Sequence, residues 1–196
     1  MGVKGYFIQY KFIIPETMKH SSYTYQKLFR ALYGYTQSVF KSNGKIYHYH
    51  RPGVLSSTPY LRPGKNCVII PSGNFQKLLE FFKTGRNPTH NWRGKGDWKA
   101  VYYMNEKTVD EKNAAAAIEL LLERHYVATE TGKKEKLSSV INIAASKTSD
   151  IDKVYVSMLL SEATPVATSD WFKNTYSQSE KLKAFYSNYK KLKTMA

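Results

Sequence analysis

Hydrophobic and polar positions along the first half of the chain divide into six segments, each with the spacing of a strand or of a helix. Runs rich in Tyr, Phe, Ile and Val that stop at Pro or Gly are typical of strands. Apolar residues spaced three and four apart are typical of helices. The pattern predicts, in order, a strand at 5–14, a helix at 22–40, strands at 45–51 and 66–70, a helix at 75–83 and a strand at 99–104.

This order of elements is that of ferredoxin-like domains, in which two strand-helix-strand halves form one sheet. We therefore expect an α+β chain whose residues 1–104 form a ferredoxin-like (βαββαβ) domain. Helices cover one face of such a sheet and the other face stays open, so each strand should have a buried side and a functional side. The fold hosts many activities and does not assign one.

The remaining residues, 105–196, are predicted to form a helical region, because the chain becomes richer in Ala and in acidic residues from Asn105 onward. The Ala-rich run after Thr108 is a strong helix former preceded by a capping box. The predicted helices lie at 112–124, 137–147, 150–161 and from Ser179 to Lys193, with a loop at Pro165. A further helix that contains Trp171 and Phe172 is predicted after this loop, with Ser169 or Asp170 as its cap.

Two of these predicted helices, at 137–147 and 150–161, have the spacing of a helix-turn-helix. The usual turn glycine is replaced by Thr148, and Asp150 and Asp152 at the start of the second helix would face phosphates unfavourably. The interpretation therefore favours a helical packing unit over a groove-binding motif.

The net charge of the chain says more about its partner than any motif does. The chain of 196 residues holds 30 Lys and Arg against 15 Asp and Glu, a formal net charge of +15, together with 16 tyrosines. Such an excess attracts polyanions. Flat rings beside cations suit unstacked bases, which stack on aromatic side chains while phosphates meet Lys and Arg. We expect a nucleic-acid partner, and exposed aromatics favour RNA or single-stranded DNA over a duplex, with RNA slightly ahead. Two variants of this class are a ribonucleoprotein or ribosome-associated component and a plasmid or viral DNA-binding protein.

The strand predicted at 45–51 is the first candidate site. Alternation places Lys45, Tyr47, Tyr49 and Arg51 on one side, a row that suits a single strand lying across an open sheet. The alternative is a solvated edge strand with β-favouring tyrosines. Residues 65–72 lack the glycine-and-aromatic signature of a true RNA-recognition motif, so any likeness to that module concerns shape only.

The loop at 84–99 is the second candidate site. Its glycines let the backbone approach a phosphate closely, and two tryptophans in a polar loop are unusual unless they anchor something. The alternative is that the indole rings fold back on the edge of the sheet. The residues expected to bind here are Arg86, Trp92, Arg93, Lys95, Trp98 and Lys99.

His48 and His50 stand two apart on one predicted strand and point the same way, so they are able to ligate one metal ion. The triplet His48-Tyr49-His50 resembles the His-hydrophobe-His motif of HUH-type nickases. The resemblance implies a divalent metal and a nucleophilic tyrosine that cut single-stranded DNA on a ferredoxin-like core, with Tyr186 or Tyr189 as the nearest tyrosine candidates. The middle Tyr departs from the aliphatic residue of the family.

Catalysis is otherwise weakly indicated. Only three acidic residues precede Met104, which argues against a nuclease with two metal ions. We therefore expect a protein without catalytic residues or cofactor, the metal-dependent endonuclease being the enzymatic alternative. A third alternative is an assembly protein whose positive face docks on an acidic partner.

The cysteine content and the hydropathy of the chain indicate the cellular compartment of the protein. Cys67 is the single cysteine, which excludes an intramolecular disulfide and fits a reducing interior. No apolar stretch approaches the length of a membrane span, and residues 1–11 lack a signal-peptide pattern. We expect an intracellular, cytoplasmic protein without a membrane partner.

Overall fold

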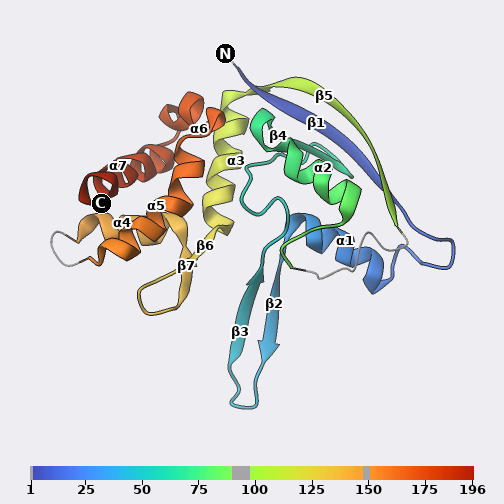
Figure 1. Ribbon diagram of the computed structural model, residues 1–196, viewed down its shortest axis with the longest axis horizontal. Helices are drawn as coiled ribbons and strands as arrows, with labels where there is room; N and C mark the ends of the chain where they lie inside the picture. The colour runs from blue at the N-terminus through green and yellow to red at the C-terminus, as the bar shows by residue number, and fades with distance from the viewer. Residues whose placement is uncertain (1, 90–97, 148–150) are drawn as a thin grey trace. The chain divides into compact units, whose positions relative to one another are not determined.

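The computed structural model describes residues 2–89, 98–147 and 151–196 and shows a mixed α+β chain (Figure 1). The chain divides into two compact units, each described here by itself. The sheet unit comprises Tyr6–Thr58 and Arg62–Glu106, and the helical unit comprises Met1–Gly5, Pro59–Leu61 and Lys107–Ala196. The expected boundary after residue 104 stays a prediction.

Two small sheets and two helices build the sheet unit. Within the described residues, one sheet has three strands in the order β4-β1-β5, and β2 pairs with β3 in a second sheet of two strands. The elements are β1 (Gly2–Ile13), α1 (Tyr23–Tyr33), β2 (Tyr35–Phe40), β3 (Ile46–Arg51), β4 (Cys67–Pro71), the short 3₁₀ turn η1 (Ser72–Asn74), α2 (Phe75–Thr84) and β5 (Lys99–Asp110).

The core of the sheet unit follows the alternation of β1. Ile8, Tyr10 and Phe12 are buried, whereas Gln9 and Lys11 between them are exposed. The Phe12 ring contacts Phe29 of α1 at 5.4 Å and Phe81 of α2 at 6.2 Å between centroids. Both helices therefore pack on the same face of β1, and the face that carries Gln9 and Lys11 is left open.

Helix α1 is shorter than predicted. It begins as expected, because the Ser22 Oγ accepts a hydrogen bond from the Tyr25 N–H at 3.2 Å. It ends at Gly34, whose φ of 76° is a backbone conformation that glycine adopts without strain. The prediction of a helix through Phe40 is wrong, since Tyr35–Phe40 forms β2 and pairs antiparallel with β3.

A close approach of two glycines marks the place where this hairpin leaves the sheet unit. A Cβ on Gly53 would lie 2.2 Å from the backbone nitrogen of Gly34, so no larger residue fits there. The returning chain is held to the end of α1 by hydrogen bonds from the Val54 and Leu55 N–H groups to the Ala31 and Leu32 carbonyls. The base of the hairpin is therefore firmly fixed.

Helices dominate the other unit. A small hairpin connects the first two helices of this unit (Figure 1). The elements are α3 (Glu111–Arg124), β6 (Tyr126–Ala128), β7 (Lys134–Lys136), α4 (Leu137–Ser146), α5 (Lys153–Ala167), α6 (Asp170–Thr175), the 3₁₀ turn η2 (Tyr176–Gln178) and α7 (Glu180–Met195).

The start of α7 was predictable and the start of α3 less so. Ser179 caps α7, and its Oγ accepts from the Leu182 N–H at 3.3 Å, which confirms that prediction. Helix α3 is capped by Asp110, which accepts from the Lys112 N–H at 2.9 Å. Thr108, the expected cap, instead lies in β5.

Pro165 lies inside α5, so the loop predicted there is wrong. A proline in the last turn of a helix removes one backbone hydrogen bond, and the helix continues to Ala167. The turn of the expected helix-turn-helix, at 148–150, lies outside the described residues, although α4 and α5 on either side are helices.

Trp171 is the largest fully buried side chain of the helical unit. Its indole N–H donates a hydrogen bond to the Lys4 carbonyl at 2.7 Å, which ties α6 to the first residues of the chain. Because the ring is buried and its one donor is satisfied, Trp171 holds the core of this unit together. Among the described helices, none has both the length and the apolar character to cross a bilayer.

Candidate nucleic-acid interface

The hairpin of β2 and β3, residues Tyr35–Arg51, is named here the arm. It extends away from the helices and the three-stranded sheet of its own unit (Figure 1). Its turn contains Asn43 and Gly44, with Gly44 at φ 77° and the Lys45 N–H donating to the Asn43 Oδ1 at 3.1 Å. Asn-Gly is a strong hairpin signal because both residues tolerate positive φ.

The register of the arm brings the expected binding residues to one face. Tyr35 pairs with Arg51, Gln37 with Tyr49, and Val39 with Tyr47. Because paired residues lie on the same face and successive residues alternate between faces, these six side chains share one face of the arm. Tyr47 and Tyr49 keep 38% and 41% of their surface exposed, and Arg51 is exposed as well. Lys45 lies in the turn and is also exposed. The structure therefore brings together four of the expected residues.

Cations outside the expected set join this face. The Lys41 ammonium lies 4.8 Å from the centre of the Tyr47 ring, and the Arg30 guanidinium lies 4.9 Å from that of Tyr35. A cation over an aromatic face is attracted by the ring quadrupole. The arm thus carries alternating rings and positive charges from its base to its turn.

These additional residues escaped prediction because a helix was expected to continue through β2. Tyr35 and Lys41 then had no defined position relative to Tyr47. The Asn43-Gly44 turn between two runs of alternating residues was the signal that would have found them.

Negative charge is absent from the sequence around the arm. No Asp or Glu occurs between Glu16 and Glu80. That stretch therefore contributes only positive charge to the arm, through Lys41, Lys45 and Arg51 among others.

The opposite face of the arm carries His48 and His50. The His48 Nδ1 lies 2.9 Å from the Ser38 Oγ, a hydrogen bond whose direction depends on the imidazole tautomer. Among the residues that the structure describes, no group of three or more His, Cys, Asp or Glu side chains is arranged to hold a metal ion. The two histidines share a face with each other but not with Tyr47 and Tyr49.

The loop predicted as the second site is described at its two ends. Trp92, Arg93 and Lys95 lie outside the described residues. Arg86 is exposed and faces Glu80, with 3.7 Å between the Arg86 Nη1 and the Glu80 Oε1. Lys99 is exposed at the start of β5.

Trp98 lies in the core of the sheet unit. Only 6% of its surface is exposed, and its ring packs edge-on against Phe12 at 5.4 Å between centroids. A second contact, to Phe81, lies at 5.5 Å. The ring has no free face for a base in this structure, which corresponds to the alternative in which the indole folds back on the sheet.

The tyrosines of α7 serve the packing of the helical unit. Tyr189 is buried, and its hydroxyl shares a hydrogen bond with the Thr164 Oγ1 at 3.2 Å. The Tyr186 ring contacts Tyr176 at 4.9 Å and has the Lys190 ammonium 4.3 Å above it. Both rings are thus engaged with neighbours of their own unit.

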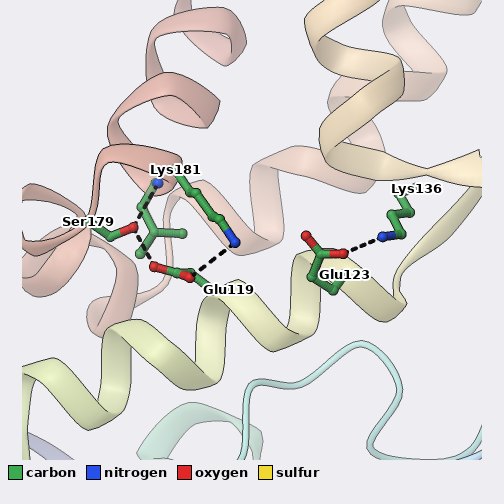
Figure 2. Close-up of polar contacts among 6 residues, drawn as sticks. Glu119, Glu123, Lys136, Ser179 and Lys181 are labelled. Carbon is green, nitrogen blue, oxygen red and sulfur yellow. Dashed lines mark hydrogen bonds and ion pairs between the residues drawn. The ribbon is translucent and has the colours of Figure 1, made fainter.

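Cations of the helical unit face carboxylates (Figure 2). Lys136 donates a hydrogen bond to Glu123, which lowers the pKa of the Glu123 carboxyl and raises that of Lys136. The Lys181 ammonium lies 3.9 Å from Glu119, whose other oxygen accepts from the Ser179 hydroxyl. Such surface pairs contribute little to stability, but they reduce the positive charge that this unit presents.

Tyr10 is a buried titratable residue of the sheet unit. The Tyr10 hydroxyl is 2.8 Å from the Tyr33 hydroxyl. Burial, with Tyr33 as the second cause, raises the pKa of Tyr10 far above its ordinary value. Tyr10 therefore stays neutral and acts as a hydrogen-bonded core residue.

Comparison with known proteins found no family model, no curated protein and no solved structure that matches this chain.

Proposed function

We propose that this protein is a non-enzymatic nucleic-acid-binding protein that binds single strands, RNA in preference to DNA, through the arm. The observation that carries the proposal is the exposed face that Tyr47, Tyr49 and Arg51 share, with the Lys41 ammonium over the Tyr47 ring. Rings of this kind stack on bases of any sequence, and the cations between them reach the phosphates.

Stability gives a second reason to expect a partner for the arm. A two-stranded hairpin is marginally stable in water by itself. Most residues of the arm are exposed on both faces, including Phe40 and Ile46 beside the turn. Local packing therefore explains little of this element, whereas a bound polyanion of complementary charge covers it.

We also infer that the sheet unit is a ferredoxin-like domain whose second strand extends into the arm. The order of elements supports this: β1, α1, the hairpin, β4, α2 and β5, with β1 at the centre of the three-stranded sheet. The contacts of Phe12 with both helices support it further. Cys67 is a free thiol, which supports a reducing intracellular compartment.

The test is fluorescence-anisotropy binding of the purified protein to single-stranded RNA, single-stranded DNA and duplex DNA over a salt series. We expect tight, salt-sensitive binding that is strongest for single-stranded RNA and leaves the oligonucleotide intact on a denaturing gel. A control polyanion, heparin, is included at an equal concentration of negative charges.

Two outcomes contradict the proposal. Equal binding to heparin and RNA favours the assembly protein that docks on an acidic partner. Cleavage in the presence of Mn²⁺, with a protein-linked DNA product that His48→Ala abolishes, favours the nickase.

A further inference from the structure

One cavity described in the sheet unit is lined by residues outside the arm. Its volume is about 750 Å³, within the range of small-molecule sites, which is roughly 300 to 1,000 Å³. Residues of β1, α1, β5 and the turn before β4 line it. None of the lining residues is Asp or Glu.

Aromatic rings form part of the wall. Tyr102 stacks on Phe82 of α2 at 5.4 Å between centroids, so Tyr102 points to the side of the sheet that the helices cover. Tyr103, its neighbour on the strand, points to the open side and keeps 61% of its surface exposed. An exposed ring anchored on a sheet offers a flat surface for a base.

A third ring is held in place by its neighbours. Tyr25 contacts His20 at 4.6 Å and Phe29 at 5.3 Å, edge-on in both cases. Because these contacts fix the orientation of the Tyr25 ring before any ligand arrives, a ligand that packs against it loses less entropy on binding.

Cations and amides supply the polar part of the cavity. Lys11, on the open face of β1, and Lys65, before β4, are both exposed and both line it. Gln9 and Asn66 add carboxamide groups, which donate and accept hydrogen bonds as base edges do. The Tyr10 N–H donates to the Asn66 carbonyl at 2.9 Å and fixes the backbone of Asn66.

We propose that this cavity receives one unstacked nucleobase of a bound RNA strand. The base stacks on Tyr103, and the adjacent phosphates are held by Lys11 and Lys65. The inference rests on the proposed function and extends it, because it assigns a second binding site to a different face of the sheet unit.

The experiment is photocrosslinking of the full chain to a short RNA that carries iodouridine, followed by mass spectrometry of the crosslinked peptide. We expect a crosslink to Tyr103. Tyr103→Ala should weaken binding of the RNA about tenfold or more, whereas Tyr103→Phe should bind as the unaltered protein does. Tyr126→Ala, which removes an exposed ring from the helical unit, is the matched control.

The cations are tested in the same assay. Lys11→Ala and Lys65→Ala should each lower the dependence of binding on salt, and Lys77→Ala, on the exposed side of α2, should leave it unchanged. Competition with uridine monophosphate, added before irradiation, distinguishes a base within an RNA strand from a free nucleotide. If micromolar uridine monophosphate prevents crosslinking, the cavity is a mononucleotide site and the strand proposal is overturned.

Failure of this inference is distinguishable from failure of the proposed function. Normal RNA binding by Tyr103→Ala, with crosslinks confined to the arm, overturns the cavity site but not the proposal that the arm binds RNA. Absence of RNA binding by the unaltered chain overturns both. Circular dichroism of each variant shows whether a loss of binding reflects a loss of folding.

Discussion

The two units hold the same number of positive residues but differ in how they use them. Each contains 15 Lys and Arg, whereas the sheet unit has 4 Asp and Glu and the helical unit has 11. Most of the net charge of +15 therefore belongs to the sheet unit. In the helical unit Lys147 faces Glu130 at 3.0 Å, whereas in the sheet unit the Lys41 ammonium lies over the Tyr47 ring. The division is not strict, because Lys190 of the helical unit lies over Tyr186 and Arg86 of the sheet unit faces Glu80.

The comparison teaches that the overall charge of a chain is a poor guide to where it binds. Equal numbers of cations leave different net positive charges on the two units, because the number and positions of the acidic residues decide which positive charges remain available. We expect substitutions in the helical unit to change stability and substitutions in the arm to change binding.

The largest expected effect is on stability. Trp171→Ala removes a fully buried ring that is hydrogen-bonded to Lys4, and should lower the free energy of unfolding by about 3 to 5 kcal/mol. Urea unfolding measures the loss. RNA affinity per folded molecule should stay unchanged, and a comparable loss of affinity would show that the helical unit takes part in binding.

The next effect concerns the salt dependence of binding. A triple variant with Lys41→Ala, Lys45→Ala and Arg51→Ala should reduce the slope of log K against log salt by about two units, because each phosphate contact to a single strand contributes about 0.7. The matched control replaces Lys190, Lys191 and Lys193 of α7. Equal slopes for the two triple variants would contradict the division of roles between the units.

A smaller effect is expected from a single ring. Tyr49→Ala should weaken RNA binding by about 1 to 3 kcal/mol if the ring stacks on a base, and Tyr49→Phe should retain most of the affinity. Anisotropy titration at constant salt measures both. Normal affinity of Tyr49→Ala would leave the arm with a purely electrostatic role.

The smallest effect is the pH dependence of stability. The pKa of Tyr10 is raised in the folded state, so the folded protein keeps this proton where the unfolded chain loses it. The corresponding stabilisation is complete below the unfolded pKa of about 10 and decreases as the pH rises above it. Tyr10→Phe should therefore lose less stability than the unaltered protein between about pH 9 and pH 11. Parallel thermal melts over that range check the prediction, and identical slopes would contradict it.

Elements with a strong local signal were predictable from the sequence. The buried strand β4 and the helix α2 lie within one or two residues of their predicted bounds, because an apolar run before Pro71 and a stripe of Leu and Phe before Gly85 each favour one structure. The boundary between α1 and β2 was not predictable from the sequence. Val39 follows Leu32 by seven residues, which continues a helical stripe as well as it fits a strand, and only pairing with β3 decides the outcome.

The candidate site was predictable to a similar extent. Alternation within β3 was sufficient to place Tyr47, Tyr49 and Arg51 on one side. The burial of Trp98 depends on Phe12 and Phe81, and the cavity depends on four separate segments. Contacts of this kind are distant in sequence, so no local pattern predicts them.

The glycine pair at the base of the arm has a consequence for protein engineering. Because Gly34 and Gly53 nearly touch, and Val54 and Leu55 are hydrogen-bonded to α1, the chain enters and leaves the arm at almost one point. A segment attached in this way is an exchangeable cassette: the hairpin can be shortened, lengthened or replaced by another recognition loop while the scaffold beneath keeps its connections.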